Sequence, residues 1–264
     1  MKHNFRKAAL STICMLIVAV MSLTGVTYAW FTAGQQATVN GMNVKVTAAD
    51  GGVQVRLLNS DTWGAELDLE VEQSGVAPVS SIDGVNFFEL GEKNAANSSQ
   101  AKVASAVKEN NNNIIVRKVQ LSNPGQAPIT VNLNGSSIQK SLANSALDND
   151  IYKAARVALI VTGAGNNKTY IYAAEQDTWF GFKAVSNSYI TLNTAVENIA
   201  VETTTDLAAA CEINLPANPD NANTENIVTV EIVIWLEGQD AHCTNANAAG
   251  AFDITLNFKD KTAQ

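Results

Sequence analysis

The sequence predicts an all-β protein, an antiparallel two-sheet sandwich of the jelly-roll type, with short helical crossovers and a signal peptide in front of it. Three observations carry this prediction. Hydrophobic and polar residues alternate with a period of two through most of the chain. The stretches between are rich in Asn, Ala, Ser and Thr, which suit surface loops. The first 29 residues have the composition of an export signal.

Residues 1–29 are predicted to be a cleaved signal peptide. Three basic residues within the first seven positions precede an apolar run over 8–26, and the small residues Thr27 and Ala29 follow it. A signal peptidase needs small residues three and one places before the cut, so we expect cleavage between Ala29 and Trp30. The run of about 19 residues is also just long enough to cross a bilayer, so an uncleaved signal anchor is the alternative.

Alternation predicts the strands of the sandwich. The clearest is Ile227–Leu236, in which every second residue from Val228 onwards is Val, Ile or Leu, and the last is Phe252–Phe258. Such patterns are typical of strands with one face in a core and the other in water. The same reasoning predicts strands at 42–48, 53–57, 67–71, 114–121, 129–133, 156–162, 168–174 and 189–193.

The connections contain few helical candidates. We expect short helices at Ser98–Glu109 and Ser136–Leu147, although neither has a strong apolar stripe. Gly163–Asn167 reads as a five-residue hairpin loop between two strands. Surface loops are expected at Asn94–Asn113, Ala217–Asn226 and Thr244–Gly250, because short polar side chains satisfy turn backbone without a core.

The charge of the chain excludes some partners. Removal of residues 1–29 leaves 14 of the 17 Lys and Arg against 25 Asp and Glu, a net charge of −11. A polyanion is repelled by phosphate backbones and by anionic membrane surfaces. We therefore expect no nucleic-acid partner and, after cleavage, no membrane association.

Two cysteines, Cys211 and Cys243, remain after cleavage. A pair in an exported chain favours one disulfide. It would close a loop of about 33 residues and contribute roughly 3–4 kcal/mol in the chain-entropy model. Two reduced thiols are the alternative.

The residues predict no enzyme, no metal site and no cofactor. The mature chain has one histidine, His242, whereas a zinc protease needs two on a helix and a serine hydrolase needs one beside a serine and an acid. His242, Cys243 and Cys211 lack the paired spacing of zinc ligands. The glycines of 160–165 lack the third glycine and the helix of a dinucleotide-binding turn, which favours a hairpin.

Two segments carry a family resemblance. Thr27-Tyr-Ala-Trp-Phe-Thr32 and Ala37-Thr-Val-Asn-Gly-Met-Asn-Val-Lys-Val46 surround the expected cut. They resemble the N-termini of the TasA/camelysin family of secreted Gram-positive biofilm-matrix fibre proteins, which have SipW-type signal peptides. Trp235-Leu-Glu-Gly-Gln-Asp-Ala-His-Cys243 is similar to a motif of clostridial relatives. Camelysin has been described as a metalloprotease, but the single histidine argues against carrying that activity over.

The resemblance implies a secreted jelly-roll subunit of an extracellular fibre, matrix or cell surface. Its expected organisation is a signal peptide (1–29), an assembling strand segment (30–41) and a β-sandwich domain (42–264). The implied assembly is head to tail by donor-strand complementation, in which Trp30, Phe31, Thr32 and Val39 join the sheet of the next subunit. The expected partners are further copies of the chain, a signal peptidase during export, and other matrix proteins or polysaccharide.

Elementary energetics support such assembly. Burial of Trp30 and Phe31 would contribute roughly 1.5–3 kcal/mol each, and each ladder hydrogen bond about 1 kcal/mol. Head-to-tail contact produces an open filament. The alternative is that the same segment folds back onto its own sandwich as an edge strand.

A second function also fits the sequence, a secreted jelly-roll module that binds carbohydrate or a host surface through its Asn-rich loops. Its candidate residues are Trp63, Trp179 and Phe180, since sugars stack on exposed rings. Burial of these aromatic side chains in the core is the structural alternative.

Overall fold

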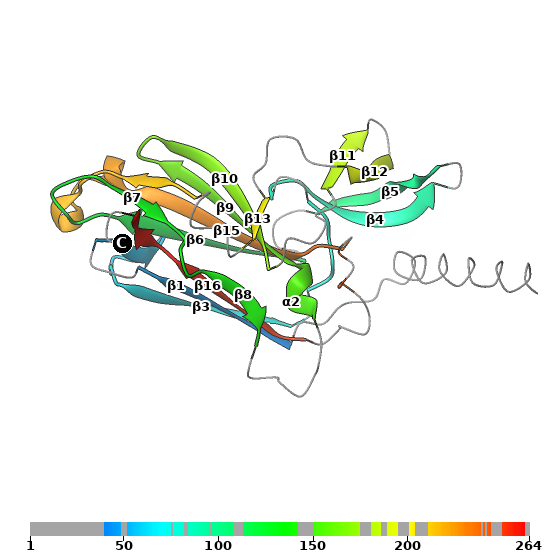
Figure 1. Cartoon of the computed structure of the whole chain (residues 1–264), viewed down its shortest axis with the longest axis horizontal. Helices are drawn as coiled ribbons and strands as arrows, with labels where there is room; N and C mark the ends of the chain where they lie inside the picture. Colours follow the sequence, from blue (N-terminus) through cyan, green and yellow to red (C-terminus); the bar gives the residue numbers. More distant parts are fainter. Residues whose placement is uncertain are drawn as a thin grey trace, which may run out of the picture.

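The computed structural model describes residues 40–48, 52–74, 76–81, 84–94, 97–107, 113–141, 150–174, 181–185, 189–194, 201–203, 211–238, 240, 242–243 and 250–261. Two layers of strands, sheet A and sheet B, form the body of the molecule (Figure 1). The predicted signal peptide and residues 30–39 of the predicted assembling segment lie outside the described residues.

Sheet A has four strands in the order β3 (Glu66–Ser74), β1 (Asn40–Thr47), β16 (Phe252–Asn257) and β8 (Ser137–Lys140). Sheet B has six strands in the order β13 (Val201–Thr203), β10 (Asn166–Ala173), β9 (Ala155–Gly163), β15 (Val228–Leu236), β6 (Ile114–Ser122) and β2 (Gln54–Leu57). The all-β sandwich expected from the sequence is therefore confirmed.

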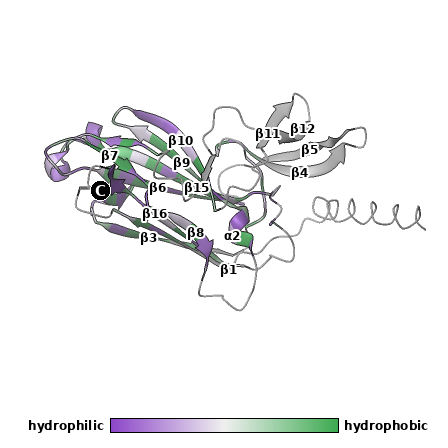
Figure 2. Ribbon diagram, viewed as in Figure 1, coloured by the Kyte–Doolittle hydropathy of each residue, from purple (hydrophilic) through white to green (hydrophobic). Residues whose placement is uncertain are grey.

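The inner faces of the two sheets form one hydrophobic core. Val44 and Val46 of β1 and Ile254 of β16 meet Leu159 of β9 and Ile232 of β15, and all five are at most 2% exposed. Figure 2 shows hydrophobic positions recurring along the strands of both layers. Complete burial of one such side chain contributes roughly 1.5–3 kcal/mol, so this shared face is the main source of the stability of the sandwich.

The predicted strands are confirmed. Each predicted range contains a strand, and the ends differ by at most three residues. Alternation was a sound guide because strands of sheets A and B such as β1, β15 and β16 place every second residue in the shared core. β15, the clearest case, lies between β9 and β6 and buries every second residue from Val228 to Leu236 at 0% exposure.

The two predicted helices are wrong. Ser98–Glu109 is almost entirely β5 (Asn97–Val107), which pairs antiparallel with β4 (Phe87–Asn94) and β12 (Tyr189–Thr194). The described part of Ser136–Leu147, residues 136–141, contains β8, which pairs with β16 and buries Ile138, and residues 142–147 lie outside the described residues. In both segments the pairing with a neighbouring strand outweighs the local helix preference of Ala, Lys and Gln. The predicted loop Asn94–Asn113 is strand over most of its length for the same reason.

The helices that the described residues do contain are single turns. They are α2 (Ile151–Ala154) and the 3₁₀ turns η2 (Pro219–Asn221) and η3 (Thr224–Asn226). None of them has the length or the apolar composition that a bilayer-spanning helix requires.

The hairpin between β9 and β10 is tighter than predicted. Gly163 pairs with Asn166, so the turn contains only Ala164 and Gly165 rather than five residues. Ala164 has φ 49° and Gly165 φ 81°, which is the left-handed backbone of a two-residue hairpin turn. The Asn166 side chain also donates a hydrogen bond of 3.1 Å to the Gly163 carbonyl.

The sandwich is mostly but not wholly antiparallel. β1 runs parallel to β16, with Val44 opposite Ile254, and antiparallel to β3 on its other side, with Val44 opposite Leu69. β13 runs parallel to β10. The first described strand is thus held in the middle of sheet A, with the last long strand beside it.

Two further sheets flank the sandwich. The accessory sheet, in the order β11 (Gly181–Val185), β12, β5 and β4, is drawn apart from both layers in Figure 1. The small sheet has the order β14 (Ile213–Leu215), β7 (Ile129–Asn132) and β17 (Lys259–Asp260). The Asn-rich loop predicted after β14 is confirmed over Ala217–Asn226.

The outer face of sheet B carries a second hydrophobic cluster. The chain between β3 and β4, here called the outer segment (76–81 and 84–87), brings Val79 and Phe87 against Trp235 of β15 and Ala158 of β9. The rings of Phe87 and Trp235 meet edge to face, with centroids 5.3 Å apart. Gly84 lies so close to the sheet that a Cβ there would be 2.5 Å from that of Ala158, so only glycine fits.

Candidate functional site

The predicted assembly residues Trp30, Phe31, Thr32 and Val39, and the cleavage residue Ala29, lie outside the described residues. The structure describes where their segment leads. β1 begins at Asn40, two residues before the predicted domain boundary, and enters sheet A between β3 and β16. The segment that precedes it is therefore joined directly to a central strand of the sandwich.

The two edges of sheet A differ. β3 has nine residues and pairs with β1 alone among the described strands, while β8 at the other edge has four residues. On β3, Glu66 and Asp68 are exposed, and Leu69 and Val71 face the core. Lys45 of β1 forms an ion pair of 2.9 Å with Glu66 on the outer face.

Two exposed apolar side chains lie at the end of β2. Leu57 is 40% exposed, and Leu58 in the turn that follows is 37% exposed. β2 is the edge strand of sheet B, and its Val55 forms an antiparallel bridge with Gly64, two residues before β3. Leu57 and Leu58 therefore lie on the side of that bridge away from β3.

The C-terminal motif singled out in the sequence forms a buried polar cluster. Glu237 is 0% exposed, and its carboxylate accepts hydrogen bonds from the hydroxyl of Ser80, the backbone N–H of Ser81 at 3.4 Å and the indole N–H of Trp235 at 3.2 Å. A buried carboxylate needs such donors, because desolvation without them costs several kcal/mol. Glu237 thereby fixes the outer segment to the end of β15.

Asp240 organises the other half of this cluster. Its carboxylate lies 2.6 Å from the guanidinium of Arg156, whose side chain is 1% exposed, and 3.0 Å from Nδ1 of His242. The backbone N–H of His242 donates to the same carboxylate at 2.8 Å. Arg156 also donates to the carbonyls of Lys153 and Ala155. The chain after β15 is thus tied to the start of β9.

The cluster has the chemistry of a structural junction. In a Ser-His-Asp triad the histidine accepts the proton of the serine, whereas here Ser80 donates to Glu237 and His242 contacts Asp240. Among the described residues, no three His, Cys, Asp or Glu side chains come together as metal ligands would. What these residues do is connect β9, β15 and the outer segment through buried charge.

The predicted disulfide is not formed in this structure, in which Cys211 and Cys243 are free thiols. Both are buried in the main core at 0% and 1% exposure, but in different surroundings. Cys211 precedes β14 and interacts with Tyr172, and burial raises the pKa of its thiol to about 12. Burial also raises the pKa of the Cys243 thiol, with Glu237 and Asp240 adding to the rise.

Both thiols are therefore expected to react slowly in the folded protein. At pH 8 almost no thiolate is present at either site, and only the thiolate attacks an alkylating agent. For the chain that begins at Trp30, incubation with iodoacetamide should add no mass in the native state and two labels after denaturation without reductant. Zero labels after denaturation would restore the disulfide, and rapid labelling of the native chain would contradict the burial of these residues.

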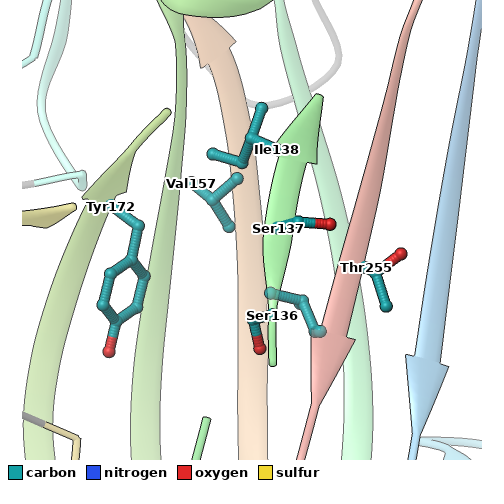
Figure 3. Close-up of a pocket in the computed structure, with 7 residues that line it drawn as sticks. Ser136, Ser137, Ile138, Val157, Tyr172 and Thr255 are labelled. Atoms are coloured by element: carbon teal, nitrogen blue, oxygen red, sulfur yellow. The ribbon is translucent and has the colours of Figure 1, made fainter. Parts of the chain in front are cut away.

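A shallow crevice lies at the other side of the sandwich, between β8 and β16 of sheet A and β9 and β10 of sheet B (Figure 3). Ser137, Ile138 and Thr255 line it from one sheet, and Val157 and Tyr172 from the other. The space between them is too narrow for a water molecule. The crevice is accordingly a seam between the two layers.

Of the three aromatic residues considered for ligand stacking, the structure describes only Trp63. Trp179 and Phe180 lie outside the described residues. Trp63 is half-buried, and the guanidinium of Arg56 lies 4.3 Å from its ring centroid. Gln120 accepts a hydrogen bond of 2.9 Å from Arg56 and fixes it there. One face of the Trp63 ring is thus occupied by a cation from the same chain.

Sequence reasoning did not find the buried cluster. The motif over 235–243 was noticed as a resemblance, without a role for Glu237 or Asp240. A usable signal was Arg156, a lone cation at the head of the apolar run Val157–Val161, because a charge in such a run needs a buried partner.

Comparison of the chain with protein-family models, with curated proteins and with solved structures finds no match. The resemblance to the TasA/camelysin family therefore depends on the residues around 27–46 and 235–243 alone.

Proposed function

We propose that this chain is a secreted structural subunit of an extracellular fibre or biofilm matrix, which polymerises head to tail by N-terminal donor-strand exchange. The segment that begins at Trp30, freed by a signal peptidase, joins the sandwich of the next copy. The position of β1 carries the proposal, because the preceding segment emerges from the middle of a sheet whose neighbouring edge strand β3 is open among the described strands.

The sandwich suits the role of a fibre subunit. Its two layers share one continuous core, and its strands are fixed in register along ladders such as that of β9 with β15, which has eight residue pairs. A jelly roll brings its first and last strands together in one sheet, and the neighbouring β1 and β16 support a jelly-roll form of this sandwich. The parallel direction of that pair is a departure from an all-antiparallel jelly roll.

Strand addition to the next copy would bury the apolar residues of the new N-terminus. Trp30 and Phe31 are large apolar residues at the new N-terminus, and each gains roughly 1.5–3 kcal/mol on burial. The ladder bonds of an added strand contribute about 1 kcal/mol each and satisfy an open sheet edge. The partners we propose are further copies of the chain, with other matrix proteins or polysaccharide bound to the finished fibre.

Removal of the N-terminal segment is expected to abolish polymers. The test compares the mature chain that begins at Trp30 with a chain that begins at Gly41, by negative-stain electron microscopy and circular dichroism. Fibres are expected from the longer chain and folded monomers from the shorter one, because the donor segment is missing. Fibres from both chains would contradict the donor-strand mechanism, and monomers from both would contradict the function.

A further inference from the structure

The geometry points to the edge of β3 in sheet A, unpaired among the described strands, as the surface that receives residues 30–39 of a second copy of this chain. This inference rests on the proposed function and goes beyond it by assigning the acceptor. It is carried by the length of the edge, the two faces of the sheet and the direction of β1.

The length of the edge fits the segment. β3 has nine residues and extends over about 30 Å, and ten residues lie between Trp30 and Val39. The other edge strands of the described sandwich are much shorter, with four residues in β8, four in β2 and three in β13. β3 is therefore the edge along which the whole segment finds ladder partners.

The two faces of the segment match those of sheet A. Its odd positions are mainly apolar, and its even positions after Trp30 are small or polar. On β3, Leu69 and Val71 are buried against the core, while Glu66 and Asp68 are exposed on the outer face. A fifth strand with one apolar and one polar face continues both surfaces of the sheet.

The direction of β1 favours a second copy as the source. Asn40 pairs with Ser74, so β1 starts at the far end of β3. To reach the free edge of its own β3, the preceding segment must first cross about 10 Å over the end of that strand. A segment from another copy has no such crossing and can pair antiparallel over its full length.

Cross-linking tests the assignment. If Trp30 is placed opposite Ser74, antiparallel pairing brings Gln36 opposite Asp68. Two double variants of the chain that begins at Trp30 are compared, Gln36→Cys with Asp68→Cys and Gln36→Cys with Gln139→Cys. Gln139 is the matched control, because it is exposed on β8 at the opposite edge of the same sheet. Assembled samples are treated with a bismaleimide whose span tolerates a register difference of about 7–8 Å between the two introduced cysteines. The native thiols of Cys211 and Cys243 are buried and are not expected to react.

The β3 variant is expected to give a ladder of covalent oligomers at least tenfold more intense than the β8 variant. A ladder from the Gln139 variant, or from neither variant while fibres form, would overturn the acceptor edge and leave the proposed function intact. Absence of fibres in the parent chain would overturn the proposed function and this inference together.

Discussion

Replacement of Asp240 by alanine is expected to lower the free energy of unfolding by about 3–5 kcal/mol. The change leaves the Arg156 guanidinium, 1% exposed, without the carboxylate that lies 2.6 Å away. An uncompensated buried charge is among the costliest defects in a folded protein. The Asp240→Ala change also removes the acceptor of the His242 backbone N–H. With the carboxylate gone, the chain after β15 loses its ion pair with Arg156 of β9.

The control for this variant is Glu212→Ala. Glu212 and Lys261 are also 2.6 Å apart, but their side chains are 48% and 46% exposed. Water and salt screen that pair, so we expect an almost unchanged urea midpoint. The double variant Arg156→Met, Asp240→Leu removes both buried charges. Its loss of unfolding free energy should therefore be smaller than the sum of the losses of Arg156→Met and Asp240→Leu alone. Equal midpoints for Asp240→Ala and Glu212→Ala would contradict the role of the buried pair.

Replacement of Trp235 by alanine is expected to cost about 3–5 kcal/mol of unfolding free energy. Trp235 is fully buried on the outer face of sheet B, in edge-to-face contact with Phe87, and donates its indole N–H to Glu237. The alanine variant opens a cavity beneath the outer segment and removes one of the donors that stabilise a buried carboxylate. The phenylalanine variant keeps most of the volume and should cost about 1–3 kcal/mol, for the lost hydrogen bond.

Trp63→Ala is the matched control, with the same residue type in a half-buried site. Its main loss is the contact with Arg56, worth about 1 kcal/mol. Urea denaturation followed by circular dichroism gives all three values, provided the slope with urea is unchanged. If Trp235→Ala were no more destabilising than Trp63→Ala, the outer segment would not be held by this side chain.

The strands could be predicted because burial on one face imposes a period of two, as β15 and β16 illustrate. The Asn-rich loop after β14 could be predicted from side-chain chemistry. Asn223 accepts from the backbone N–H of Glu225, Asn218 accepts from that of Asn223, and Asn226 donates to the carbonyl of Ala217. Short polar side chains thus replace the ladder bonds that a loop lacks.

Strand partners could not be predicted, because local patterns do not encode which strands meet. The Ala- and Ser-rich stretch that contains β5 has no clear period, and its pairing with β4 and β12 decides its structure. The parallel neighbours β1 and β16 come from opposite ends of the described chain, so their pairing depends on how the whole chain folds. The same holds for Glu237 and Asp240, whose burial depends on the outer segment and on Arg156, about 80 residues or more away in the sequence.

The central claim of a donor strand that passes between copies is tested most directly by a capping experiment. The chain that begins at Gly41 keeps the acceptor edge and has no donor segment, so it should end the growth of any fibre that it joins. Increasing fractions of it are mixed with the chain that begins at Trp30, and fibre lengths are measured by electron microscopy. We predict a mean length that falls in inverse proportion to the fraction of the shorter chain. Fibre lengths that do not change over the whole range would contradict the account.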